Sequence, residues 1–192
     1  MTQQVDFNVP LDADKKITNN QRIVGALPTI RYAIDNGAKA VILMSHLGRP
    51  DGKRNPKYSL KPVVPELEKL LGENVIFTDD CVGKEVEDTV NSASGGQVIL
   101  LENLRFHPEE EGSSKDAEGK KVKADKEKVA EFRKGLTALG DIYISKTVAW
   151  ATKFGWLNHF RRCIRHCSSR SQLHGRRRSP SKGIRISSQE GA

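Results

Sequence analysis

Short apolar runs alternate with segments of helical periodicity along the first 144 residues of the chain. The continuous apolar runs predict buried strands at 40–44, 75–77, 98–101 and 142–144. Apolar residues that recur every three or four positions predict helices over 20–36, 60–71, 83–92 and 123–139. Pro28 lies inside the first of these helices and should kink or split it, because proline lacks the N–H that a helix interior requires.

The alternation of strands and helices predicts the α/β class, with a doubly wound, Rossmann-like parallel sheet in a single domain. Helices on both faces of the sheet explain why the strands are continuous apolar runs. Residues 109–125 are charged and have no apolar face, so they should form an exposed loop or a ragged hairpin. Ligands of such sheets bind beyond the carboxyl ends of the strands, and the residues found there are the candidates for a site.

Charge divides the chain into two unlike parts. Of the net charge of +8, residues 1–144 contribute −2, from 21 basic and 23 acidic residues, and residues 145–192 contribute +10, from 11 basic residues and Glu190. The second part is therefore interpreted as a tail of different origin, and its scarcity of apolar residues after Phe160 predicts disorder. No long apolar stretch and no signal sequence is visible, which predicts a cytoplasmic protein without membrane contact.

Basic side chains follow two of the predicted strands at their carboxyl ends. The strand at 40–44 is followed by His46 and Arg49, and the strand at 98–101 is followed by Arg105 and His107. The planar guanidinium of arginine makes paired, charge-assisted hydrogen bonds to carboxylate or phosphate, so this pattern indicates an anion site. The alternative is that the arginines are ordinary surface residues and the histidines cap loops.

The start of the chain adds three candidates to the anion site. Asp6 and Asn8, in a short segment stopped by Pro10, offer acceptors for a ligand hydroxyl, although such a segment is a simple turn as often as a site. Arg22 opens the first predicted helix, where the helix dipole does not favour a cation. That position suits an anion held between Arg22 and the helix amides, and it equally suits an exposed arginine.

Six ordered motifs resemble the N-terminal domain of the phosphoglycerate kinase family over about residues 5 to 144. They are Val5-Asp-Phe-Asn-Val-Pro10, Ile17-Thr-Asn-Asn-Gln-Arg22, Ser45-His-Leu-Gly-Arg-Pro50, Lys57-Tyr-Ser-Leu60, Asp80-Cys-Val-Gly83 and Leu100-Leu-Glu-Asn-Leu-Arg-Phe-His107. The resemblance implies a monomeric glycolytic enzyme of two doubly wound domains. Such an enzyme moves a phosphoryl group between 1,3-bisphosphoglycerate and Mg-ADP.

In the family the N-terminal domain holds the glycerate, and the C-terminal domain holds Mg-ATP or Mg-ADP. The resemblance therefore implies 3-phosphoglycerate or 1,3-bisphosphoglycerate as the partner of this chain, and no nucleotide site within it. The substrate-binding residues that it implies are Asp6, Asn8, Arg22, His46, Arg49 and Arg105. Arg22 matches the family arginine that stabilises the transferring phosphoryl group, a role that suits phosphoryl transfer because negative charge spreads over its oxygens.

The chain departs from the family pattern at both ends. Only four residues precede Val5, so the first strand of the family is expected to be missing and the domain, assigned to 1–144, to be incomplete. From residue 145 the family pattern stops, and residues 162–176 match the expected continuation translated out of frame. We therefore hypothesise that residues 145 to about 161 are a retained intron and that the rest is a frameshifted exon. The last substrate arginine of the family is absent as well.

The tail also offers weaker patterns. Cys163 and Cys167, with His159 and His166, resemble a loose set of zinc ligands, but out-of-frame translation explains them better. The basic run 176–178 predicts non-specific binding of nucleic acid at low salt.

Three functional interpretations follow from these patterns. The leading one is a fragment of phosphoglycerate kinase that is inactive alone, because phosphoryl transfer requires both substrates to be held in line. The alternative is a non-catalytic half-domain that binds an anion or a partner and carries a basic, nucleic-acid-binding tail. The third is an unstable product with no function of its own. A domain's net stability is only about 5–15 kcal/mol, so the apolar burial lost with an incomplete sheet could be decisive.

Overall fold

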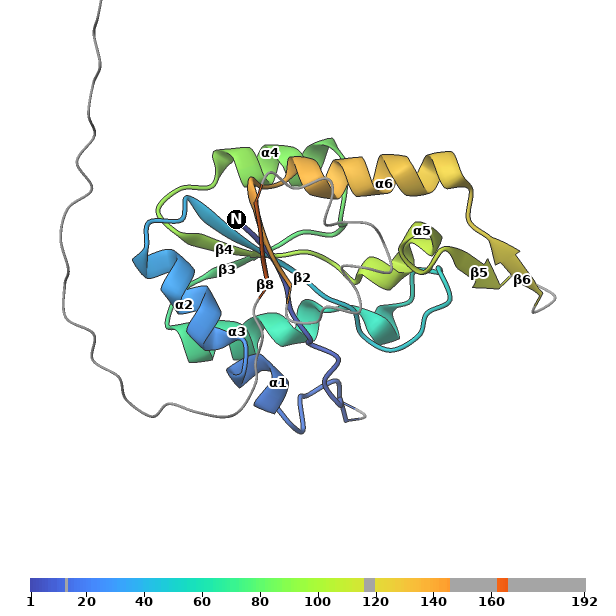
Figure 1. Ribbon diagram of the computed structural model, residues 1–192. Coiled ribbons are helices and arrows are strands. Elements are labelled where there is room, and N and C mark those ends of the chain that lie inside the picture. Colours follow the sequence, from blue (N-terminus) through green and yellow to red (C-terminus); the bar gives the residue numbers. More distant parts are fainter. Residues whose placement is uncertain (13, 116–119, 146–161, 166–192) are drawn as a thin grey trace, which may run out of the picture.

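The computed structural model describes residues 1–12, 14–115, 120–145 and 162–165 (Figure 1). Six parallel strands form the main sheet in the order β3-β4-β2-β1-β7-β8. Their bounds are β1 Thr2–Gln4, β2 Ala40–Met44, β3 Val75–Phe77, β4 Gln97–Leu100, β7 Ile142–Ser145 and β8 Arg162–Arg165. A separate antiparallel hairpin joins β5 (Ser113–Lys115) to β6 (Lys121–Lys123).

Helices cover both faces of the main sheet, which confirms the predicted doubly wound α/β fold. On one face lie α1 (Gln21–Val24), α2 (Leu27–Asp35) and α3 (Val64–Leu71), and on the other lie α4 (Lys84–Ser92) and α6 (Lys126–Ala138) (Figure 1). Three short 3-10 helices, at Pro56–Tyr58, Lys61–Val63 and Leu104–Phe106, and α5 (Pro108–Glu111) complete the described elements. Among the described residues, no helix is both long and apolar enough to cross a bilayer.

Two apolar cores sandwich the sheet, and β2 contributes to both. Val41 and Leu43 pack toward α1, α2 and α3, whereas Ile42 and Met44 pack toward α4 and α6. Successive side chains of a strand point to opposite faces, so a strand covered on both sides must be apolar throughout. This is why 40–44 is a continuous apolar run, as the sequence pattern indicated.

The helix predicted over 20–36 is divided into α1 and α2. Gly25 closes α1, and Pro28 lies in the first turn of α2 instead of interrupting a continuous helix. Proline is tolerated in a first turn because the N–H groups there have no partner within the helix. The charged segment 109–125 contains the predicted hairpin, together with the short helix α5, which the sequence pattern did not indicate.

The expectation that the first strand would be missing is wrong. Thr2–Gln4 forms β1 in the middle of the sheet, paired with β2 on one side and β7 on the other. Its ladder continues at Val5, whose N–H donates to the Met44 carbonyl oxygen over 2.9 Å. Three polar residues form a strand here because two apolar neighbours offer their backbone groups on both sides, and strand pairing depends on backbone groups more than on side-chain type.

The expectation of disorder in the tail is also wrong in part. Ser145 ends β7, and Arg162–Arg165 forms β8 parallel to β7 at the edge of the sheet. An edge strand presents unpaired backbone groups that accept a further strand regardless of its side chains. The rest of the tail, including Cys167, lies outside the described residues, so the predicted disorder and the intron hypothesis remain predictions.

Candidate anion-binding site

The loops that follow β1, β2 and β4 meet beyond the carboxyl ends of these strands. They carry Asp6 and Asn8 after β1, His46 and Arg49 after β2, and Arg105 in the 3-10 helix after β4. Because β1, β2 and β4 are neighbours in the sheet, residues far apart in sequence are brought to the same edge.

Asp6 and Arg22 form a two-point ion pair. Nη1 of Arg22 lies 2.8 Å from Oδ1 and 2.7 Å from Oδ2 of Asp6. Asp6 Oδ1 also accepts from the Asn8 backbone N–H at 3.3 Å. Both charged side chains are partly exposed, with 49% and 40% of their surfaces accessible, so solvent screens the attraction. The pair therefore serves more to orient the Arg22 guanidinium than to stabilise the fold.

Charged groups of the site act on His46. Burial lowers the pKa of His46 from 6.5 to about 4, and the positive charges of Arg105 and Arg22 act in the same direction, against the opposing effect of Asp6. The imidazole is thus neutral at pH 7. These electrostatic effects show that Asp6, Arg22 and Arg105 lie close enough to act on the His46 ring.

Arg105 and Asn8 are joined through the loop that contains Gly48. Nη1 of Arg105 donates to the Gly48 carbonyl oxygen at 2.7 Å, and the Gly48 N–H donates to Oδ1 of Asn8 at 3.0 Å. Nε of Arg105 lies 3.2 Å from a carboxylate oxygen of Glu111. The side chain is largely buried, so these contacts hold the guanidinium in a defined orientation. The Asn8 side chain therefore contacts the loop that contains Gly48, a role that the sequence analysis did not predict.

Gly48 is required by the backbone at this point. Its φ of +62° lies in the left-handed region, and a Cβ atom there would collide with the Tyr58 ring. Arg49, the next residue, is exposed and makes no ion pair with any residue that the structure describes. The structure thus places Arg49 on the rim of the site without fixing its side chain.

Two buried polar residues that the sequence analysis did not single out organise the site. Nδ2 of Asn103 donates to the carbonyl oxygens of Leu47 (2.7 Å) and Tyr58 (2.8 Å), and Oδ1 accepts from the Arg105 N–H at 3.0 Å. The Glu102 carboxylate accepts from the Ser59 hydroxyl at 2.7 Å and from the Leu60 and Asn103 N–H groups at 2.8 Å each. The available signal was a Glu-Asn pair directly after an apolar strand, where buried polar groups must find partners.

A parallel α/β sheet with arginines and a histidine gathered at its carboxyl edge is an arrangement typical of domains that bind phosphate or carboxylate groups. The sequence model of the family described as phosphoglycerate kinase matches residues 2–154, which is most of the chain. The chain belongs to the phosphoglycerate kinase family.

The relatives agree with this assignment. Phosphoglycerate kinase of Aspergillus flavus is 84% identical over 142 residues, which cover 74% of this chain and 34% of that protein. Phosphoglycerate kinase of Coxiella burnetii has a similar structure, with a TM-score of 0.62 and 31% identity over 85% of this chain and 37% of that chain. The enzyme of Pyrococcus horikoshii matches with a TM-score of 0.61 and 30% identity, over 78% of this chain and 34% of that chain. The chain thus spans about a third of the length of the curated relatives it matches.

Proposed function

We propose that the described domain binds 3-phosphoglycerate or 1,3-bisphosphoglycerate at the carboxyl edge of its sheet. The observation that carries the proposal is the cluster in which the charges of Arg22 and Arg105 act on the neutral imidazole of His46. Arg22 and Arg105 supply charge and forked donors for phosphate or carboxylate, and the neutral imidazole donates or accepts without adding a third charge. Asp6 and Asn8 offer oxygen acceptors to the ligand hydroxyl.

Arg22 and Arg49 differ in how firmly their guanidinium groups are held. Arg22 has further N–H donors beyond the Nη1 group that contacts Asp6, so it serves the transferring phosphoryl group without leaving its partner. Arg49 is exposed and unpaired among the described residues, which leaves it free to turn onto a bound anion. On binding, the Arg49 side chain then becomes ordered, whereas the other groups of the site are already in place.

Phosphoryl transfer also requires Mg-nucleotide, and the site does not fit that group. Magnesium prefers several oxygen ligands, whereas Asp6 is paired with Arg22 and Glu111 is paired with Arg105. We therefore infer that the 192-residue polypeptide binds phosphoglycerate without catalysing turnover, and that the nucleotide needs a separate binding domain. From the family assignment we also propose that the polypeptide acts in the cytoplasm as a monomer, and from the charge of its tail that it binds nucleic acid only non-specifically.

Isothermal titration calorimetry of the full chain with 3-phosphoglycerate tests the proposal. We expect one site per chain, an affinity greater than for inorganic phosphate or sulfate, and no ATP-dependent formation of bisphosphoglycerate. Arg105→Met should weaken binding about 10- to 100-fold, because a charge-assisted hydrogen bond contributes about 1.5–3 kcal/mol.

The matched control is Arg31→Gln, which removes an arginine charge from α2 at a position where Nη2 of Arg31 donates to the Leu70 carbonyl oxygen at 2.7 Å. This variant should bind as the unmodified chain does. Equal affinity for 3-phosphoglycerate and sulfate would favour the alternative, a non-catalytic half-domain with a general anion site. Equal losses in both variants would exclude a specific role for Arg105.

A further inference from the structure

A cluster of three potential metal ligands lies apart from the anion-binding residues. One ligand atom each from Asp80, Cys81 and His107 lies within 4.8 Å of the other two. Nε2 of His107 is 2.6 Å from Oδ1 of Asp80, and the Cys81 thiol donates to the Glu102 carbonyl oxygen at 2.9 Å. Carboxylate, thiolate and imidazole are the three ligand types that proteins use for zinc.

The fold holds these side chains in place from separate elements. Asp80 and Cys81 follow β3, and Asp80 Oδ1 accepts from the Cys81 N–H at 2.6 Å. His107 follows β4 and lies against the Phe132 ring of α6, with ring centroids 4.8 Å apart. A histidine packed in this way loses little side-chain freedom when it binds a metal, so the cluster is prearranged.

The electrostatic surroundings of the thiol favour a cation. Cys81 is fully buried, and the carboxylates of Asp80, Glu102 and Glu110 all act on its sulfur, with Arg54 as the opposing charge. A proton at this position can be replaced by a divalent ion, which neutralises several negative groups at once.

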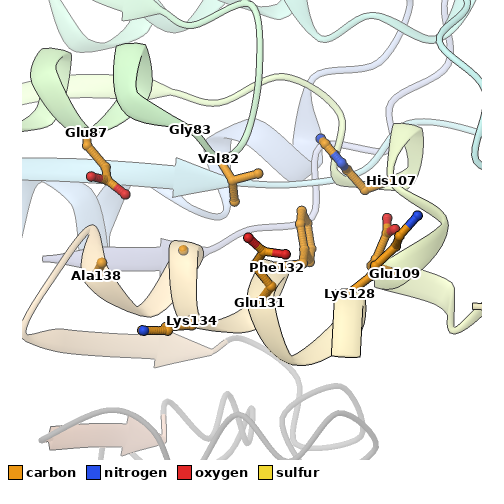
Figure 2. Close-up of a pocket in the computed structure, with 11 residues that line it drawn as sticks. Val82, Gly83, Glu87, His107, Glu109, Lys128, Glu131, Phe132, Lys134 and Ala138 are labelled. Atoms are coloured by element: carbon orange, nitrogen blue, oxygen red, sulfur yellow. The ribbon is translucent and has the colours of Figure 1, made fainter. Parts of the chain in front are cut away.

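An approach from solvent exists beside the cluster. The His107 side chain is 24% exposed and that of Asp80 is 50% exposed, although Cys81 is buried. His107 also lines a cavity of about 540 Å³ between α4 and α6 (Figure 2). Figure 2 shows His107 at one end of this cavity beside Phe132. An ion can therefore reach the nitrogen and carboxylate first and the sulfur afterwards.

We propose that Asp80, Cys81 and His107 form a binding site for a divalent ion of the zinc type. The ion takes the place of the Cys81 thiol proton, which passes to water, and separates the contact between Asp80 and His107. Ligands about 2.0–2.3 Å from a tetrahedral ion lie about 3.5 Å apart, so side-chain shifts of about 1 Å are sufficient. The three protein ligands leave a fourth position for water.

Cobalt(II) provides the test, because a thiolate bound to it gives a charge-transfer absorption band. The experiment uses the full chain with Cys163→Ser and Cys167→Ser, since the sequence has three cysteines and Cys81 is then the remaining thiol. Circular dichroism first verifies that this double variant keeps the fold. We expect the band to saturate at one cobalt per chain and to disappear when Zn²⁺ is added. A folded chain that shows no band would overturn the proposal.

Matched variants assign the other two ligands. Asp80→Asn and His107→Gln should each weaken cobalt binding by about 10-fold or more, a loss at least as large as that of an outer partner of a metal ligand. Asp79→Asn makes the same charge change one residue away, outside the cluster, and should bind within about twofold of the parent chain. Equal effects of Asp79→Asn and Asp80→Asn would contradict the site, because they would indicate a general charge effect. Cys81→Ser should abolish the band, and these other variants keep the test decisive even if Cys81→Ser does not fold.

Discussion

At the scale of single residues, Asn103 joins three segments of the anion-binding site. Its side chain satisfies the carbonyl oxygens of Leu47 and Tyr58 and the N–H of Arg105, and it is fully buried. It therefore connects the loop after β2, the segment before α3 and the loop after β4. The sequence contains this residue in one of the family-like motifs, but only its partners in the folded chain show what it does.

Asn103→Ala should lower the free energy of unfolding by about 3 kcal/mol, because it leaves buried backbone groups without hydrogen bonds. The same change should weaken phosphoglycerate binding, since Arg105 and the Gly48 loop lose a common support. Urea denaturation and calorimetry measure the two effects. Asn91→Ala, at an exposed position of α4, is the matched control and should change neither quantity appreciably. A stable Asn103→Ala variant would show that water replaces the amide.

His46 makes stability depend on pH. Its pKa of about 4 in the folded chain lies below the ordinary value of 6.5, so the unfolded chain binds more protons between these limits. Stability from this residue is therefore complete above pH 6.5 and is lost as pH falls toward 4. The loss is about 2 kcal/mol after allowance for the partial exposure of the ring.

Urea denaturation at pH 7 and pH 4.5 tests this prediction for the unmodified chain and for His46→Gln. The free energy of unfolding should change less between the two pH values in the variant than in the unmodified chain. The other titrating groups are common to both chains, so the difference reports His46. An identical difference would mean that His46 is protonated in the folded chain. The sequence identified His46 as a candidate, but its shifted pKa depends on burial and on charges contributed by other loops.

At the scale of elements, β1 is the least expected part of the sheet. Its Thr2 is fully buried, pairs with Ile42 and Tyr143, and has a hydroxyl oxygen with no hydrogen-bond partner within the described part of the chain. Periodicity does not reveal a three-residue strand of polar side chains. The strand exists because β2 and β7 flank it and supply backbone partners from residues about 40 and 140 positions away.

Thr2→Val should raise the free energy of unfolding by about 1 kcal/mol, because it replaces an unsatisfied buried hydroxyl with a methyl group of similar volume. Thr2→Ser is the matched control, since it keeps the hydroxyl and removes the methyl group, and it should destabilise the chain. Thermal or urea unfolding measures the change in stability of each variant. Destabilisation by valine would indicate that the hydroxyl binds an ordered water.

At the scale of the whole molecule, the carboxyl edge of the sheet concentrates the chemistry. The anion-binding cluster lies beyond β1, β2 and β4, and the proposed metal site lies beyond β3 and β4, toward the core beneath α4 and α6. Arg105 and His107 are two residues apart, yet Arg105 contacts Gly48 while His107 contacts Asp80. A single loop after β4 thus serves both sites because its residues turn toward different neighbouring strands.

The alternation of apolar runs and helical periods by itself determined the α/β class, the positions of β2, β3, β4 and β7, and the basic residues that follow the strands. These features are local, because each depends on side chains within a few residues. Only the tertiary structure decided that β1 lies at the centre of the sheet, that β8 joins its edge, that His46 is neutral and that Cys81 lies beside Asp80 and His107. The reason is that strand order, burial and the charges around a side chain depend on segments that are distant in sequence. A local sequence pattern does not show which of these segments lie close together.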